Sequence, residues 1–250
     1  MNRADTLTEI RRVLALDQAC DEDALLGDGV YVVESQRIEG RRKFPFRTHR
    51  LGAVTMGGTV VVSCDAGRMP WVRKTLGDMN RDDVFSATTI ALLTEFVAPR
   101  GQSMAGPDLK FACDDASLRM HEVPAGVDVA LLREGQAHEL YAFSGFGNAL
   151  QYSADSDRPD VLVCVARVEG QVIGVAGASA DCDSMWQVGI DVVEGHWKRG
   201  IGKALVAQLT QAILGACRVP YYSTTPANIP SRALAISVGY WPAWVELYAT

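Results

Sequence analysis

The feature that most constrains the fold is the stretch DVVEGHWKRGIGKALVAQL, from Asp191 to Leu209. A β-branched run is followed by a cluster of positive charge, then by two glycines one residue apart, and then by the apolar spacing of an amphipathic helix. A strand that leads through glycines into a helix brings unpaired backbone N–H groups and the positive end of the helix dipole to one point. Together with Lys198, Arg199 and Lys203, the pattern predicts a site for phosphate oxygens.

Three other interpretations of this turn compete. The dinucleotide fingerprint G-x-G-x-x-G needs a third glycine where Leu205 stands, and an acidic residue about 20 positions later, which the segment VPYYSTT lacks. The phosphate loop G-x-x-x-x-G-K-[ST] matches the spacing of Gly195 and Gly200, but Ile201 occupies the lysine position. The third interpretation is an ordinary helix start flanked by solvated cations.

Composition argues against several classes of function. The chain has 250 residues, of which 48% are hydrophobic, and its uncharged apolar runs fall well short of the roughly 18 residues that a membrane helix requires. Charges alternate with apolar residues near the N-terminus, which is typical of a helix rather than a signal peptide, so we expect a cytoplasmic protein without membrane contact. The six cysteines form no C-x-x-C pair and the four histidines are isolated, so we expect no metal site. A net charge of −6 argues against nucleic acid as a partner.

A break at residues 121–128 predicts an N-terminal α/β domain over 1–122 and a C-terminal domain over 123–250. The first domain is expected to contain a helix over 5–16, a strand VYVVES, and either a strand pair or one long bulged strand around Gly57 and Gly58. Helices over 70–79 and 82–98 and a strand DLKFAC are expected to follow. The second domain is expected to begin with a strand (VDVALLRE), a helix (GQAHELYAFSGF), a hairpin (DVLVCVARVEGQVIGVAGASAD) and a strand (MWQVGIDVV). The glycine turn and its helix come next. A strand (VPYYSTT), a helix (NIPSRALAISVG) and a last strand (AWVELYAT) complete the domain.

This order of elements, with the glycine turn, resembles the GNAT N-acetyltransferases. Members carry [Q/R]-x-x-G-x-[G/A] after their fourth strand, and the segment from Lys198 to Leu205 matches its glycines, although Trp197 stands where Gln or Arg is usual. The segment NIPSRALAISVGY is similar to the one whose Asn contacts coenzyme A, which indicates Asn228 with Ser231 nearby. Asn228 is equally suited to cap its own helix. The resemblance covers about residues 125–250 and implies a mixed central sheet flanked by helices.

The resemblance implies transfer of an acetyl group from acetyl-CoA to a primary amine of a small molecule or peptide, by direct attack through a tetrahedral intermediate. The fourth strand is where the family parts two parallel strands, so the acetyl group is expected near residues 188–191, with Gly189 as a bulge. The residues expected to bind coenzyme A are Val192, Val193, Lys198, Arg199, Gly200, Ile201, Gly202, Lys203, Ala204, Asn228 and Ser231. Two alternatives stay open: an inactive acetyl-CoA-binding sensor, and transfer of a different acyl group.

The chemistry requires a base for the substrate ammonium, N–H donors for the oxyanion and a proton donor for the departing thiolate. Asp191 and Glu246 lie on strands expected to flank the cleft, and a half-buried Glu246 would have a raised pKa. The position seven residues after Asn228, where many members have a tyrosine acid, is Ala235. We therefore consider Tyr222 as the acid, with other nearby hydroxyls or a water as alternatives.

One expectation concerns assembly. A single strand follows the last helix where many family members have two, so the resemblance leaves one edge of the sheet without its usual neighbour. An unpaired edge attracts another strand. We expect it to be covered either by a second subunit, which would give a homodimer, or by the N-terminal domain.

Overall fold

A computed structural model describes residues 1–44 and 51–250, and the described chain is mixed α/β as predicted. It divides into two compact units, of which the first comprises Met1–Leu7, Phe111–Ser223 and Asn228–Pro242, and the second Thr8–Lys110, Thr224–Ala227 and Ala243–Thr250. Helix α1 (Arg3–Gln18) and strands β4 (Met104–Ala112) and β10 (Trp241–Ala249) contribute residues to both units. The domain boundary at residue 122 therefore stays a prediction.

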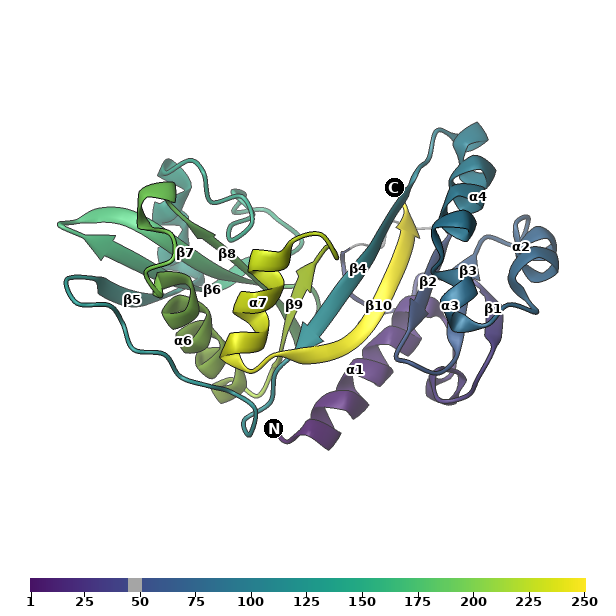
Figure 1. The fold of residues 1–250 in the computed structure, drawn as a ribbon, viewed down its shortest axis with the longest axis horizontal. Coiled ribbons are helices and arrows are strands. Elements are labelled where there is room, and N and C mark those ends of the chain that lie inside the picture. The colour runs from purple at the N-terminus through teal and green to yellow at the C-terminus, as the bar shows by residue number, and fades with distance from the viewer. Residues whose placement is uncertain (45–50) are drawn as a thin grey trace. The chain divides into compact units, whose positions relative to one another are not determined.

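The first unit is built on a mixed sheet with the strand order β9-β8-β7-β6-β5 (Figure 1). Strands β8 and β9 are parallel, whereas the remaining neighbours are antiparallel. The strands are β5 (Asp128–Arg133), β6 (Asp160–Val168), β7 (Gln171–Ala180), β8 (Met185–Val192) and β9 (Val219–Thr224). Each coincides with a predicted strand, because a β-branched run with turn residues at its ends marks it in the sequence.

Helices cover both faces of this sheet. Helix α6 (Ile201–Gly215) packs on one face and has nine buried residues, which explains its amphipathic pattern. On the other face lie α5 (Glu134–Ala137), the 3₁₀ turn η3 (His138–Ala142) and an irregular segment, whose Phe146 and Leu150 pack against Val163 and Val165. The helix predicted over GQAHELYAFSGF is thus confirmed only in its first half. Helix α7 (Ile229–Val238) follows β9.

The second unit contains β1 (Val30–Glu34), β2 (Gly52–Thr55) and β3 (Val60–Cys64), in the order β1-β3-β2-β10-β4. Strands β2 and β3 pair in antiparallel orientation around Gly57 and Gly58, so of the two alternatives for this stretch the strand pair is the one observed. The apolar side chains of β2, β3 and β10 form one core with α2 (Met69–Leu76), α3 (Arg81–Val84) and α4 (Ala87–Val97). The last strand pairs with β2, which belongs to the N-terminal part of the chain, and a homodimer stays a prediction.

The helix predicted over 82–98 is wrong in one respect, because it is two helices. It breaks between α3 and α4, where Ser86 adopts an extended backbone with φ −72° and ψ 154°. The Ser86 hydroxyl accepts a hydrogen bond from the N–H of Thr89 at 3.2 Å. Serine competes with the helix for backbone N–H groups in this way, so it starts a second helix here instead of continuing the first.

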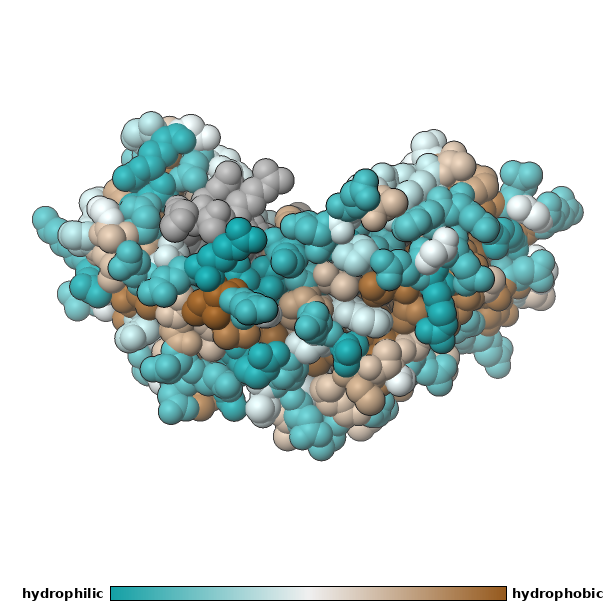
Figure 2. Space-filling view, turned by 180° about the vertical axis from the view of Figure 1, so that it is seen from behind, coloured by the Kyte–Doolittle hydropathy of each residue, from teal (hydrophilic) through white to brown (hydrophobic). Residues whose placement is uncertain are grey.

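None of the helices in the described ranges is long and apolar enough to cross a membrane. Hydrophilic residues cover most of the face in Figure 2, and apolar residues show between them. Scattered apolar residues of this kind are ordinary on protein surfaces.

Replacing Ser86 by Ala should test the break between α3 and α4. The substitution removes the side-chain acceptor for the Thr89 N–H and should lower the free energy of unfolding by about 1 kcal/mol, measured by urea denaturation. Ser86→Asp, which restores an acceptor, should recover most of the loss. Equal stability of the alanine variant and the parent protein would show that this cap contributes nothing.

Candidate functional site

The candidate site begins where β8 and β9 stop pairing. Their parallel register runs from Met185 opposite Val219 to Val188 opposite Tyr222 and then ends. Strand β8 continues for four residues, from Gly189 to Val192, and stays in register with β7 on its other side. Within the described residues, this stretch therefore has a paired side and an open side.

The open side carries the backbone groups of Ile190 and Val192. Successive residues of an antiparallel strand direct their backbone groups alternately to either side. The Val193 N–H donates to the Ile173 carbonyl on the β7 side at 2.9 Å, so Val192 and Ile190 point the other way. The Trp197 indole Nε1–H donates to the Val192 carbonyl at 2.5 Å. The Ile190 N–H, the Ile190 carbonyl and the Val192 N–H are left facing the open side of β8, where the pairing with β9 has ended.

Helix α6 starts without a side-chain cap. Its N-cap is Gly200, held in the left-handed conformation at φ 87°, and two residues earlier Lys198 is also left-handed at φ 59°. A glycine adopts this backbone at little cost but offers no oxygen to the helix. Helix α7, by contrast, is capped by Asn228, which accepts from the Ser231 N–H at 3.2 Å. The first N–H groups of α6 are consequently available to an external acceptor.

Positive charge surrounds that start. Lys198, Arg199 and Lys203 are exposed, and no acidic residue lies in the first turn of α6. The Ala204 N–H already donates to the Gly200 carbonyl at 3.1 Å, so the open amides end at residue 203. The uncapped helix start with its cations suits an anion.

The second glycine of the turn serves packing. A Cβ at Gly202 would lie 3.0 Å from the Leu234 Cδ1 of α7 and within 4 Å of Val192 and Ile190. Gly202 therefore lets α6 approach both β8 and α7 closely. This contact holds the open amides beside the open edge of β8.

A tyrosine lies where β9 leaves β8. The Tyr222 hydroxyl is 2.7 Å from the Ser231 hydroxyl on α7, and its ring packs edge-on against Tyr240. Burial raises the pKa of Tyr222, and the nearby charge of Asp191 adds to that rise, while the hydrogen bond with Ser231 opposes it. The phenol therefore keeps its proton at neutral pH.

The comparisons with known proteins agree with this geometry. The acetyltransferase (GNAT) family matches residues 131–240. The C-terminal half of the chain contains a GNAT acetyltransferase domain. A GCN5-related N-acetyltransferase-like protein from Streptococcus suis aligns over 99% of both chains with 17% identity and a TM-score of 0.51. A Drosophila protein aligns over 84% of this chain and 77% of its own with 14% identity and the same TM-score, 0.51. Both likenesses concern the fold.

A third structure shares only part of its length. A GCN5-related N-acetyltransferase from Kribbella flavida is 21% identical over 63% of this chain, with a TM-score of 0.48, and this chain spans 62% of that protein. Curated proteins gave no match.

Asp191, one of the predicted catalytic residues, lies in the GNAT domain on the strand with the open edge. Its carboxylate accepts hydrogen bonds from the segment around Asn148. The bulge predicted at Gly189 is wrong for the pairing with β7, because the register passes unbroken through Gly177 opposite Gly189. A Cβ at Gly189 would lie 1.8 Å from the Asn148 carbonyl oxygen, so the glycine makes room for another backbone.

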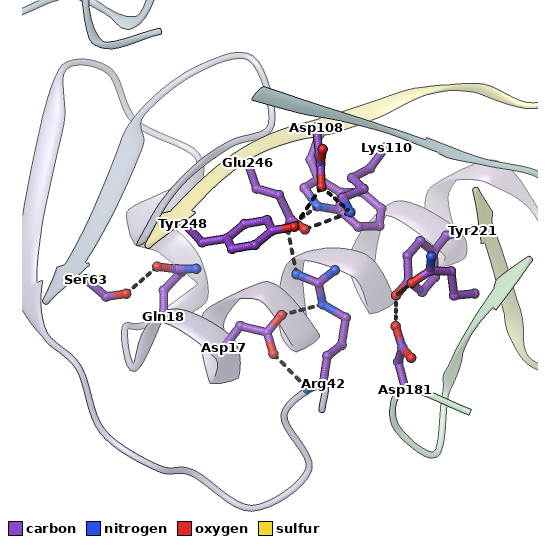
Figure 3. A network of polar contacts seen from close by, with 12 residues as sticks. Asp17, Gln18, Arg42, Ser63, Asp108, Lys110, Asp181, Tyr221, Glu246 and Tyr248 are labelled. Carbon is purple, nitrogen blue, oxygen red and sulfur yellow. Dashed lines mark hydrogen bonds and ion pairs between the residues drawn. The ribbon is translucent and has the colours of Figure 1, made fainter. Parts of the chain in front are cut away.

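Glu246 lies in the second unit, outside residues 131–240, in a buried ionic cluster (Figure 3). Its carboxylate pairs with Arg42 at 2.8 Å and with Lys110 at 2.9 Å, and all three side chains are at most 1% exposed. Arg42 also binds Asp17 at 2.6 Å, and the Trp244 indole donates to Glu246 at 2.9 Å. A buried carboxylate with these partners stabilises the unit.

The raised pKa expected for Glu246 is wrong. Burial alone would raise the pKa, but the charges of Arg42 and Lys110 and the hydrogen bonds from Arg42 and Trp244 outweigh it and lower it to about 2. For Asp17 the balance is reversed, because burial raises its pKa despite Arg42. A carboxyl group with a pKa near 2 is a weak base, so this environment does not favour Glu246 as the group that deprotonates an amine. Its catalytic role stays an untested prediction.

Sequence reasoning missed the contacts on the β8 face opposite α6. Arg158 pairs with Asp181 and donates to Gln187 at 3.1 Å. The buried Tyr221 hydroxyl donates to Asp181 (Figure 3). Nothing in the local spacing joins these residues. The sequence signals on this face are Asp191 and the pair of glycines, Gly177 and Gly189, in neighbouring strands.

Stability below neutral pH should report the Glu246 cluster. The pKa of Glu246 falls from 4.5 to about 2 on folding. Its contribution to the free energy of unfolding is therefore complete above pH 4.5 and is lost as the pH falls toward 2. The free energy of unfolding should therefore decrease more steeply below pH 4.5 in the parent protein than in Glu246→Gln, measured by urea denaturation. Glu95→Gln, at an exposed site of the same unit, should keep the steep slope. Equal slopes in parent and Glu246→Gln would contradict the assignment.

Proposed function

We propose that the GNAT domain transfers an acetyl group from acetyl-CoA to a primary amine of a small molecule or peptide in the cytoplasm. The observation that carries the proposal is the open edge of β8 beside the uncapped, cation-flanked start of α6. The open edge of β8 offers N–H donors to a carbonyl, and the start of α6 offers N–H donors to a diphosphate. Within the described residues all six cysteines are free thiols, which suits a reducing compartment.

The diphosphate of acetyl-CoA would be held by the first amides of α6, from Ile201 to Lys203. Lys198, Arg199 and Lys203 add positive charge around them. Phosphate at a helix N-terminus gains both hydrogen bonds and the helix dipole, and the cations add charge-assisted contacts. Asn228 and Ser231, at the start of α7, would contact the cofactor beside their capping role.

The Ile190 N–H would polarise the thioester carbonyl, and the Val192 N–H would bind the pantetheine arm. A fixed N–H that faces the carbonyl oxygen stabilises the negative charge that develops there. The amine attacks as its neutral form, so its proton must first leave, either to a carboxylate or to a water. The C–N bond forms and the C–S bond breaks, and Tyr222 donates its proton to the departing thiolate. The proton that the amine nitrogen loses as the amide forms then restores the Tyr222 phenol.

The rival proposal is a domain that binds acetyl-CoA without turnover. Its basis in the sequence is that Trp197 stands where the family usually has Gln or Arg, and Ala235 where many members have a tyrosine. Trp197 does not block the turn, because its indole holds the Val192 carbonyl while its ring stays 58% exposed. A panel of polyamines, aminoglycosides, amino acids and lysine peptides separates the two proposals. Thiol release with at least one amine supports catalysis, and saturable binding without release supports the sensor.

Binding of coenzyme A should depend on the cations of the turn. In Lys198→Gln combined with Arg199→Gln, the dissociation constant measured by calorimetry should rise by about 10- to 100-fold, because two charge-assisted contacts are lost. Pantetheine lacks the phosphates, so its weaker binding should not change. Arg119→Gln, at an exposed cation of the same unit, is the matched control and should bind coenzyme A normally. An unchanged constant in the double variant would place the diphosphate elsewhere.

Tyr222→Phe should lower kcat for the best amine of the panel by about 100-fold, the usual effect of losing a general acid, with little change in the affinity for coenzyme A. Tyr240→Phe is the control. Tyr240 is also buried, but its hydroxyl contacts Thr210 at 2.6 Å, so kcat should stay within about twofold of the parent value. If both variants lose kcat equally, the effect is structural and Tyr222 is not the acid.

A further inference from the structure

Trp197 occupies one of the backbone groups on the open edge of β8. Its indole Nε1–H donates to the Val192 carbonyl at 2.5 Å, on the side of the strand where the pairing with β9 has ended. The Val192 N–H lies on the same side, because the N–H and the carbonyl of one residue point the same way in an antiparallel strand. At Val192 the edge therefore offers a donor, while its acceptor is already used from within the chain.

The indole is exposed, whereas the backbone that carries it is fixed. Trp197 is 58% exposed, so little packing holds its ring in place. It follows the 3₁₀ turn η4 (Glu194–His196), and its N–H donates to the Glu194 carbonyl at 3.1 Å. A side chain with most of its surface in water changes rotamer readily. The indole can therefore leave the Val192 carbonyl while the turn keeps its backbone.

The open edge suits a ligand with amide groups along an extended chain. Such a ligand hydrogen-bonds to a strand edge as a further strand would. The pantetheine arm of coenzyme A has two amides, each with an N–H and a carbonyl. The Val192 N–H suits an amide carbonyl of the arm, and the Val192 carbonyl suits an amide N–H. The carbonyl oxygen has a second lone pair, but a donor that approaches from the open side meets the indole ring bonded there.

We propose that Trp197 competes with the pantetheine arm for the Val192 carbonyl, so that the indole must leave before an amide N–H of the arm can bind there. The proposal rests on the proposed function. It makes Trp197 a residue that sets the affinity for coenzyme A. Binding has to break a hydrogen bond that the free protein already has, and the apparent dissociation constant rises accordingly. The competition concerns the arm alone, because the diphosphate is assigned to the start of α6.

Trp197→Phe tests the competition, because it keeps a ring at this position and removes the N–H. The dissociation constant of coenzyme A, measured by calorimetry, should fall by about three- to tenfold, the usual effect of one hydrogen bond. Pantetheine, which has the arm without the diphosphate, should bind more tightly by the same factor. ADP, which has the diphosphate without the arm, should bind as it does to the parent protein. Trp186→Phe is the matched control on the same strand, where the ring lies 6.0 Å from the Arg218 guanidinium, and it should change none of these values.

A second measurement follows the indole directly. Each of the five tryptophans gives one indole N–H signal in the NMR spectrum, and the signal that Trp197→Phe lacks belongs to Trp197. In the free protein this signal should lie downfield, as expected for a hydrogen-bonded N–H. Coenzyme A and pantetheine should both move it to the position of an indole N–H in water, whereas ADP should leave it in place.

Several outcomes would overturn the competition. One is an equal or larger dissociation constant of coenzyme A in Trp197→Phe, and another is an indole signal that stays in place when coenzyme A is bound. Weaker binding in Trp197→Ala than in Trp197→Phe would show that the ring holds the coenzyme instead of competing with it. Failure of both the parent protein and Trp197→Phe to bind coenzyme A would refute the proposed function itself, whereas binding with an unmoved indole would refute the competition alone.

Discussion

The end of strand pairing at Val188 and Tyr222 is the constraint on which the rest of the GNAT domain depends. Two parallel strands that stay paired satisfy each other's backbone groups and leave nothing for a ligand. Here β8 continues beyond its pairing with β9 while β7 still pairs with its other side. The unpaired N–H groups therefore lie on a strand whose position is fixed. Donors fixed in this manner need no reorganisation when charge develops beside them.

The glycines around this edge solve different physical problems. Gly200 takes a left-handed backbone and gives α6 a start without a cap, which leaves its amides open. Gly202 lets α6 pack closely on α7, and Gly177 and Gly189 admit a second layer of backbone onto the sheet. The sequence alone does not distinguish these roles. The contacts show that Gly200 provides a left-handed backbone, whereas the other three glycines permit close packing. Of the two roles, the left-handed backbone at Gly200 is the one that serves anion binding.

Much of the fold could be predicted because its signals are local. The strands β5 to β9, the helix α6 and the cap at Asn228 follow from periodicity and from residue types beside one another. The break at Ser86 was also local, but a serine inside an apolar helical pattern reads equally well as a helix residue. Asn148, which donates to Asp191, lies 43 residues away in sequence, and Arg42, which pairs with Glu246, lies 204 residues away. Sequence spacing does not predict contacts at such separations, so these partners could not be predicted.

Asp191 and Glu246 illustrate why a carboxylate on an apolar strand is a weak indicator of a base. Burying a charge without partners is costly, so a folded chain either neutralises the group or surrounds it with donors. Glu246 has cations and an indole, and Asp191 has two amides and an amide side chain. In both, the contacts that make the charge tolerable also occupy lone pairs that proton abstraction would use. On Asp191 they fill three of about four.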